Sequence, residues 1–298
     1  MKIERTGDSL SVSCPAKVNL FLEIHGRRPD GYHEIETVMQ AVTVYDTIAL
    51  QPRADGAIVL RCSDPTVPAG PDNLAHRAAD LLRREVGLPA GVSIALDKQI
   101  PSGAGLGGGS SDAAGVLAGL NELFELGLDK PRLGGLAARL GSDVAFFGYG
   151  GTALCTGRGE RVTPIPADLE AHYVICCPPR PLSTAQVYEN LSRLGLTSAE
   201  RSASVIMDFL ARGDFGSACQ SLFNRLDEVA VSLSPEVREV KELLTRRAST
   251  AALVSGSGSA VYVLLDSGAR AAEVAGCMSR VGVGRVFVAR PEPISNGA

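Results

Sequence analysis

The chain has few of the residues that build metal clusters or bind nucleic acids. Only four histidines are present, and they are too dispersed for a metal cluster. Lysine and arginine number 29 against 33 acidic residues, which gives a net charge of −4. Because no basic block occurs either, we expect no nucleic-acid groove. No apolar run is long enough to span a bilayer, and Met1-Lys-Ile-Glu does not open a signal peptide, so no membrane partner is expected.

The cysteines are scattered and odd in number. None of the seven forms a C-x-x-C pair or a zinc spacing. This usage is typical of reduced, mostly buried thiols in a cytoplasmic protein. The length of 298 residues, 45% of them hydrophobic, is sufficient for two domains, each with its own core.

Strand-like and helical patterns alternate along the first half. Strands are expected at residues 10–24, 35–50, 58–62, 92–96, 144–147 and 152–155. Helices are expected from about residue 72 and at 111–124 and 132–140. The run Thr163-Pro-Ile-Pro-Ala167 has the composition of a linker, because prolines do not continue a sheet interior. We therefore predict two domains, residues 1–164 and 165–298.

The second half predicts an α+β sandwich. Strands are expected at 172–177, 251–254, 261–265 and 285–289, with helical segments between residues 184 and 247 and a helix at 269–281. Four strands with interleaved helices favour helices on one face of a sheet.

The most informative segment is the glycine loop, residues 101–111. Five of its seven positions from Gly103 to Gly109 are glycine, and the loop lies between a strand-like and a helical pattern. Glycines let backbone N–H groups approach an anion closely. Ser110, Ser111 and Asp112 are expected to form the cap and first turn of the following helix, whose N-terminus favours negative charge. The segment therefore predicts a phosphate-binding loop.

Other glycine loops fit less well. The string Gly103-x-Gly105-x-x-Gly108 matches a dinucleotide motif, but a second helix, not a strand, follows the first. A P-loop needs lysine where Gly109 stands. An ordinary tight turn that binds no ligand needs only one or two glycines, whereas this loop has five. A connector without a ligand therefore ranks well below phosphate binding.

Two charged residues in apolar surroundings are candidates for phosphoryl-transfer chemistry. Lys17 lies in a strand pattern, where an unpaired ammonium costs several kcal/mol to bury. Asp143 lies at the edge of the apolar run Val-Ala-Phe-Phe. Either charge alone would be expected to reach solvent at a strand end, whereas the two together make an ion pair plausible.

Polar residues near these candidates could bind a substrate. Asn19 should point to the same face of its strand as Lys17. Tyr32 and His33, between two strands, could contact a base or form a solvated hairpin tip. Gly256-Ser-Gly258 fits a tight turn about as well as it fits a ligand contact.

Three motifs together resemble the signatures of the GHMP kinases, over nearly the whole chain. They are Pro15-Ala-Lys-Val-Asn-Leu, the glycine loop, and Val254-Ser-Gly-Ser-Gly-Ser-Ala. Arg28-Pro-Asp-Gly-Tyr-His-Glu-Ile, Asp72-Asn-Leu and Asn224-Arg-Leu-Asp are similar to one group within that superfamily. The resemblance implies a ribosomal protein S5-like α/β N-terminal domain that binds ATP, a ferredoxin-like C-terminal α+β sandwich, and an active site in the cleft between them.

The resemblance also implies a reaction and its residues. ATP with Mg²⁺ would phosphorylate the 2-hydroxyl of a cytidine diphosphate-linked methylerythritol, in the non-mevalonate route to isoprenoid precursors. Asp143 would be the catalytic base, and Lys17 would lower the pKa of the hydroxyl and stabilise developing charge. The residues implied to wrap the ATP phosphates are Pro101, Ser102, Gly103, Ala104, Gly105, Leu106, Gly107, Gly108, Gly109, Ser110 and Ser111.

Asn19, Tyr32 and His33 would hold the cytidine, Tyr188 would stack on the cytosine, and Asn73 would contact the adenine side of ATP. Ala145 and Asp227 depart from the proline and glutamate that the family often has. The resemblance leaves open the metal ligands, where Ser110, Ser111 or mainly the phosphates could serve, and a monomer or a homodimer. The alternatives are a GHMP kinase for another small alcohol, such as mevalonate or homoserine, and a non-catalytic nucleotide-binding regulator.

Overall fold

The computed structural model describes residues 1–167, 169–193 and 201–292 and contains two sheets. The first sheet has the order β1-β2-β3-β5-β4; β6 pairs with β3, β7 with β6, and β9 with β2. Its strands are β1 (Lys2–Thr6), β2 (Ser9–Arg27), β3 (His33–Arg53), β4 (Ile58–Cys62), β5 (Gly91–Asp97), β6 (Thr152–Gly157), β7 (Arg161–Pro164) and β9 (Phe223–Asn224).

The burial pattern of β2 shows where the layers meet. Residues 9–14 alternate between partly and fully buried, as expected where one face is covered. Every residue from Cys14 to Ile24 is buried, because elements cover both faces of the sheet there. Lys17 and Asn19 therefore lie in the most enclosed part of the molecule.

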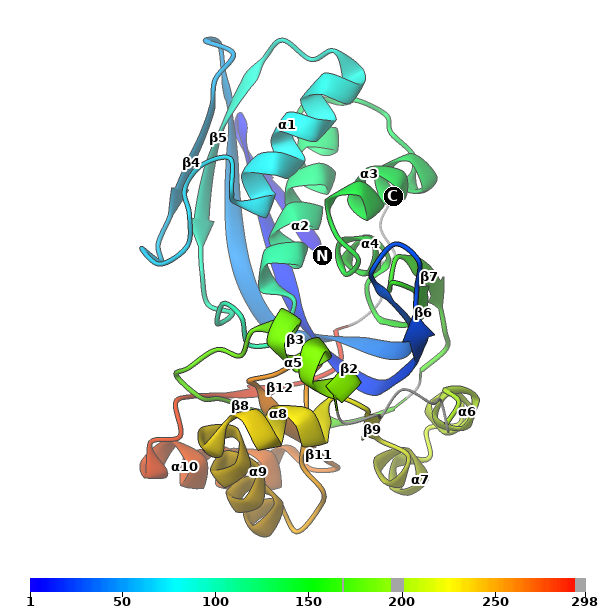
Figure 1. Ribbon diagram of the computed structural model, residues 1–298. Helices are drawn as coiled ribbons and strands as arrows, with labels where there is room; N and C mark the ends of the chain where they lie inside the picture. Colours follow the sequence, from blue (N-terminus) through cyan, green and yellow to red (C-terminus); the bar gives the residue numbers. More distant parts are fainter. Residues whose placement is uncertain (168, 194–200, 293–298) are drawn as a thin grey trace.

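Helices cover one face of the first sheet (Figure 1). They are α1 (Leu74–Val86), α2 (Gly108–Leu123), α3 (Lys130–Leu140) and α4 (Val144–Tyr149). Glycines allow α2 to lie close to the strands: a Cβ on Gly115 would be 2.3 Å from Cys14 Sγ, and one on Gly119 would be 2.4 Å from Leu50 Cδ1. This close packing fixes the N-terminus of α2 above β2.

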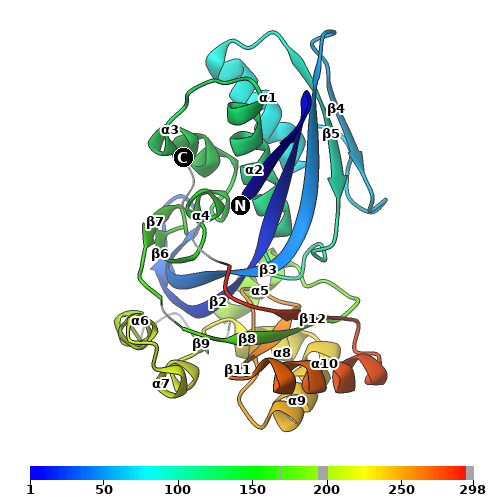
Figure 2. The same ribbon diagram turned by 180° about the vertical axis from the view of Figure 1, so that it is seen from behind.

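The second sheet has the order β10-β11-β8-β12 and is antiparallel throughout. Its strands are β8 (His172–Cys177), β10 (Leu253–Val254), β11 (Val261–Leu265) and β12 (Arg285–Ala289). Helices α9 (Pro235–Ala248) and α10 (Gly268–Val281) cover one face (Figures 1 and 2). On the other face, Tyr173 and Tyr262 pack with buried residues of β2 and β3. The predicted α+β sandwich is confirmed.

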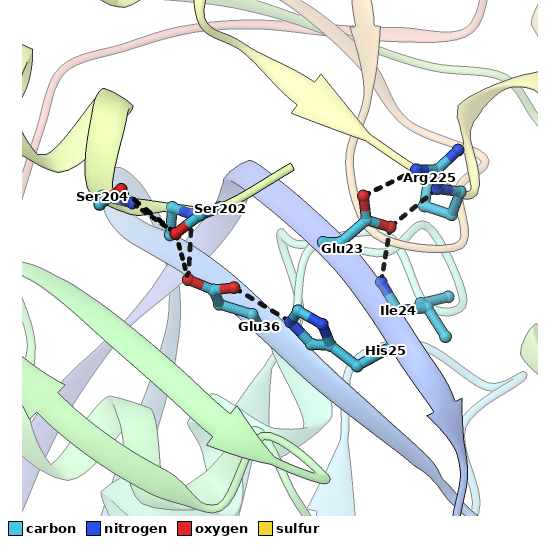
Figure 3. Close-up of polar contacts among 8 residues, drawn as sticks. Glu23, Ile24, His25, Glu36, Ser202, Ser204 and Arg225 are labelled. Atoms are coloured by element: carbon cyan, nitrogen blue, oxygen red, sulfur yellow. Dashed lines mark hydrogen bonds and ion pairs between the residues drawn. The ribbon is translucent and has the colours of Figure 1, made fainter. Parts of the chain in front are cut away.

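The remaining helices lie around the junction of the two sheets (Figure 1). They are α5 (Thr184–Arg193), α6 (Ser204–Ala211), α7 (Phe215–Gln220) and α8 (Asp227–Leu233). Glu36 of β3 accepts the Ala203 N–H at 2.9 Å and lies 3.0 Å from His25 Nε2, which joins the approach to α6 to the first sheet (Figure 3). Along the described chain, no helix is long and apolar enough to cross a membrane.

Several local expectations were wrong. The run at 144–147 forms helix α4, not a strand; a short apolar run fits either element when buried, and Phe146 and Phe147 are buried here. Helix α2 begins at Gly108, so Ser110 and Ser111 lie within its first turn and Gly107 is the cap. The expected linker begins inside β7, since Pro164 is tolerated on an edge strand that pairs only with β6. β1 and β9 were not anticipated. The domain boundary at 164/165 stays a prediction.

Candidate active site

The glycine loop has the backbone geometry of an anion-binding turn. Gly103, Gly105 and Gly107 have φ values of +68°, +77° and +72°, which favour glycine. A Cβ on Gly105 would lie 2.1 Å from the Ser255 carbonyl oxygen, and one on Gly107 would lie 2.8 Å from the Phe147 ring. Gly107 provides no side-chain cap to α2, so the first N–H groups of this 16-residue helix can bind an anion.

A buried ion cluster braces both ends of this loop. Asp46 Oδ1 accepts the N–H groups of Gln99 and Ile100 at 2.6 and 2.8 Å. Lys98 Nζ forms ion pairs with Asp46 and, at 2.7 Å, with Asp112 on α2. Burial raises the pKa of Asp112 to about 7, because removal from water disfavours the charged carboxylate. Lys98 lowers this pKa, but the negative charge of Asp46 offsets part of that attraction. The cluster therefore ties β3, the loop entry and α2 together.

Sequence reasoning missed this cluster, although signals existed. Lys98 and Asp112 flank the glycine loop, and Asp46 interrupts the apolar pattern of β3. Each is a charge that an amphipathic pattern would not place inside, which marks it as a candidate for a buried pair.

Lys17 and Asp143 meet beside the glycine loop. Lys17 Nζ lies 3.6 Å from Asp143 Oδ2. Lys17 comes from β2 and is buried, whereas the Asp143 side chain, at the start of α4, is 31% exposed. The Lys17 N–H donates to the Leu106 carbonyl at 2.9 Å, so the catalytic candidate and the loop share a direct backbone contact. The structure thus joins residues that are 126 positions apart in the sequence.

Asn19 holds the Lys17 ammonium in place. Lys17 Nζ donates to Asn19 Oδ1 at 2.6 Å, and Asn19 Nδ2 donates to Thr37 Oγ1 at 2.9 Å. Thr37 Oγ1 in turn donates to the Phe21 carbonyl at 2.6 Å. The expectation that Asn19 and Lys17 share a face is confirmed, and the chain of hydrogen bonds orients the amide.

A cleft of about 720 Å³ opens from this pair, and eight of the eighteen candidate site residues line it; of the glycine loop, only Gly105 and Gly107 do. Those that line it are Lys17, Asn19, Tyr32, His33, Gly105, Gly107, Asp143 and Tyr188. Asn73 is not among them: it caps α1, with Oδ1 accepting the Ala75 N–H at 2.8 Å and Nδ2 donating to the Pro68 carbonyl at 2.7 Å.

Aromatic rings gather at the far end of the cleft. The His33 and Tyr188 rings lie 4.8 Å apart between centroids, and Tyr32 is 54% exposed. His33 Nε2 is buried without a hydrogen-bond partner among the described residues, so it can bind a ligand atom. Burial, with the nearby Arg27 charge, lowers the pKa of His33, so the ring stays neutral to a lower pH than an ordinary histidine does.

Two arginines in the cleft were missed by sequence reasoning. Arg27 lines it, and Arg158 stacks over the Tyr32 ring at 4.8 Å. Arg158 follows β6 and Arg27 ends β2, so only the folded sheet brings them together. Their charges can bind an anionic substrate group.

The turn at residues 255–258 completes the site. Ser255 Oγ donates to the Gly105 carbonyl at 3.0 Å, and the Ala260 N–H donates to the Ala104 carbonyl at 3.0 Å. A Cβ on Gly256 would lie 3.3 Å from Lys17 Nζ. The glycine loop and the turn at residues 255–258, here called the third glycine turn because it lies in the third signature motif, therefore lie against each other and close to Lys17.

This arrangement fits phosphoryl transfer to a hydroxyl group. The glycine loop can hold phosphates, an ammonium can neutralise developing charge, and a partly exposed carboxylate can accept a proton. The described residues contain no group of three or more histidine, cysteine, aspartate or glutamate side chains that could hold a metal ion.

Comparison with known proteins gives consistent matches along the chain. Residues 73–151 match the GHMP kinases N terminal domain, and residues 206–284 match the GHMP kinases C terminal domain. The 4-diphosphocytidyl-2-C-methyl-D-erythritol kinase of Brevibacillus brevis is 42% identical over 94% of this chain and 96% of its own.

Solved structures give the same picture. A crystal structure of 4-(cytidine 5'-diphospho)-2C-methyl-D-erythritol kinase superposes with a TM-score of 0.78, at 35% identity, over 95% of this chain and all of that one. Homoserine kinase from Cytophaga hutchinsonii has a TM-score of 0.76 at 18% identity, over 98% of each chain, which shows a shared fold.

Proposed function

The chain belongs to the GHMP kinases, in the group of 4-diphosphocytidyl-2-C-methyl-D-erythritol kinases, and from this premise we propose a role for each residue of the cleft. It uses ATP to phosphorylate this cytidyl alcohol in the non-mevalonate route to isoprenoid precursors. The observation that supports the residue roles is the 3.6 Å approach of Lys17 to Asp143 beside the glycine loop.

The loop, residues 101–111, binds the ATP phosphates. Its left-handed glycines turn the backbone, and the N-terminus of α2 supplies N–H groups and a favourable dipole. The Asp46–Lys98–Asp112 cluster keeps both ends of the loop in place.

Asp143 accepts the proton of the 2-hydroxyl as this oxygen attacks the γ-phosphorus and the bond from that phosphorus to the departing ADP breaks. Its exposed fraction leaves the carboxylate open to the cleft, while Lys17 is buried and fixed by Asn19. The ammonium lowers the pKa of the substrate hydroxyl and stabilises the negative charge that develops on its oxygen. Positioning and electrostatics supply most of the catalysis in such transfers.

The aromatic end of the cleft binds the cytidine diphosphate part of the substrate. Tyr32, His33 and Tyr188 offer ring faces for the cytosine, and His33 Nε2 offers a hydrogen bond to it. Arg27 and Arg158 provide positive charge for the diphosphate. Smaller alcohols such as mevalonate or homoserine would leave these groups without partners, which favours the cytidyl substrate.

Mg²⁺ accompanies ATP in this proposal, and the residues present fit a limited role in holding it. In kinases Mg²⁺ is bound by one or two protein oxygens, waters and the phosphates. The buried Ser111 Oγ, which has no hydrogen-bond partner in the described part of the chain, is one such oxygen at the start of α2; Ser110 is the other candidate. When bound, the ion would neutralise phosphate charge.

Two further assignments are part of the proposal. Asn73, by capping α1, shapes the adenine side of the nucleotide site without donating its engaged amide. Cytoplasmic location is supported by the seven cysteines, all of which are free thiols.

The test is a substrate panel. The purified protein with ATP and Mg²⁺ should phosphorylate the cytidyl alcohol and leave mevalonate and homoserine unchanged. His33→Ala should raise KM for the cytidyl alcohol about tenfold, because a hydrogen bond and a ring contact are lost. The control His172→Ala, on β8 in the second sheet, should not change that KM. Equal use of mevalonate or homoserine would contradict the substrate subsite.

A further inference from the structure

A short segment of the second half inserts beside the strand that carries Lys17. β9 pairs in parallel with β2, with Phe223 opposite Phe21 and Asn224 opposite Leu22. The Arg225 N–H continues this pairing by donating to the Leu22 carbonyl at 2.8 Å. Residues 224–227, here called the clamp segment, therefore begin opposite Leu22, three residues along β2 from Asn19.

Asn224 of the clamp segment holds the third glycine turn. Its side chain is buried, and Nδ2 donates to the carbonyl oxygens of Val254 at 2.8 Å and Gly256 at 2.7 Å. Its Oδ1 accepts the Leu226 N–H at 2.9 Å. Both ends of the amide are thus engaged, and Asn224 holds the backbone on both sides of Ser255.

Asp227, at the end of the clamp segment, also binds the backbone of Val254. Its Oδ1 accepts the Val254 N–H at 2.8 Å, and its other oxygen pairs with Lys241 of α9. Val254 is therefore bound through both its N–H and its carbonyl to the clamp segment. The strand end that leads into the turn has little freedom to move.

Arg225 anchors the clamp segment to β2. Its Nε and Nη2 donate to the two carboxylate oxygens of Glu23 at 2.8 and 2.7 Å (Figure 3). The Glu23 side chain has no exposed surface, and its Oε1 also accepts the Ile24 N–H at 2.9 Å. A planar two-bond contact of this kind sets orientation as well as distance.

The turn that is held in this way lies close to Lys17 and Asn19. A Cβ built on Gly256 would be 3.3 Å from Lys17 Nζ and 3.2 Å from Asn19 Oδ1, so little space separates the backbone of the turn from these side chains. Through Ser255 the turn also contacts Gly105 of the glycine loop. A shift of the turn would therefore move the surface on which both the ammonium and the phosphate loop rest.

We propose that Asn224 and Arg225 are positioning residues for phosphoryl transfer, acting through the third glycine turn on Lys17 and the glycine loop. The inference depends on the proposed roles of Lys17 and Asp143. Neither residue contacts substrate in this proposal. Their loss lowers kcat through geometry, because displacement of a reacting group by about 1 Å can cost about 100-fold in rate.

The test compares Asn224→Ala with the control Asn121→Ala. Asn121 also braces a loop through its amide, donating to the Leu128 carbonyl at 3.1 Å and accepting the Leu128 N–H at 2.9 Å, far from the cleft contacts. For Asn224→Ala we expect kcat to fall about 10- to 100-fold, with KM for ATP and for the cytidyl alcohol within about threefold. Asn121→Ala should lower the melting temperature and leave kcat within about twofold.

Arg225→Lys provides a second variant, because it keeps the charge and loses the paired hydrogen bonds with Glu23. Arg225→Lys should lower kcat while KM for ATP and for the cytidyl alcohol stays within about threefold. If Asn224→Ala does not fold, the result for Arg225→Lys tests the inference. A folded Asn224→Ala or Arg225→Lys protein with wild-type kcat would overturn the inference. Asp143→Asn is measured alongside: if that variant stays active, the proposed roles of Lys17 and Asp143 fail, whereas an inactive Asp143→Asn beside unaffected clamp variants removes only the inference.

Discussion

Asp112 links the stability of the enzyme to pH in an unusual direction. Lys98 faces two carboxylates, Asp46 and Asp112, and all three side chains are less than 5% exposed. With both carboxylates ionised, the cluster holds one excess negative charge out of water. Protonation of Asp112 removes that excess, which is why its pKa rises to about 7.

The magnitude follows from the two pKa values. A carboxyl whose pKa rises from 3.8 in the unfolded chain to about 7 in the folded protein destabilises the folded state, once ionised, on the order of 4 kcal/mol. Because the folded pKa is raised, the folded state binds the proton more tightly. Stability from this group is therefore full below about pH 4 and is lost as pH rises to about 7.

Asp112→Asn removes this dependence, since an amide stays neutral at every pH and leaves Lys98 paired with Asp46. We expect the unfolding free energy of Asp112→Asn, minus that of the wild type, to rise by a few kcal/mol between pH 4.5 and 8. Urea unfolding followed by circular dichroism measures it. The control Asp80→Asn, which removes an exposed pair with Arg84, should give a difference that stays flat with pH. A flat difference for Asp112→Asn as well would refute the reasoning.

Three further predictions concern the cleft. Lys17→Met should lower kcat about 100- to 1,000-fold in steady-state assays, because it removes the group that stabilises the developing charge; an unchanged kcat would remove Lys17 from the mechanism. Gly105→Ala should weaken ATP binding at least about tenfold by calorimetry, since the left-handed backbone alone costs about 1–2 kcal/mol without glycine. The control Gly134→Ala, on α3 outside the loop and with no atom within 4 Å of the added Cβ, should bind ATP normally. Arg158→Ala should raise KM for the cytidyl alcohol about tenfold and leave KM for ATP unchanged; a rise in KM for ATP alone would place Arg158 at the nucleotide instead.

The sequence allowed prediction of what depends on local pattern. The glycine loop was recognisable because its glycines and the following helix are contiguous, and the side-by-side placement of Lys17 and Asn19 follows from strand periodicity. The strands at 172–177, 261–265 and 285–289 were predicted with the bounds that the structure shows. These features need no knowledge of distant contacts.

Features that depend on long-range contacts could not be predicted in this way. Residues 144–147 carry no period that separates a buried strand from a short helix, so α4 and the position of Asp143 at its start were missed. The pairing of Asp46 with Lys98 spans 52 residues, and that of Glu23 with Arg225 spans 202. Nothing near these residues in the sequence identifies their partners.

The most direct measurement of the Lys17–Asp143 mechanism is a single-turnover assay of Asp143→Asn with ATP and the cytidyl alcohol, both at saturating concentration, by rapid quench. The substitution preserves shape and removes the proton acceptor, so the rate of phosphoryl transfer should fall about 100- to 10,000-fold while the ATP dissociation constant stays within about threefold. Transfer at the wild-type rate, with ATP bound equally well, would show that the carboxylate next to Lys17 is not the base.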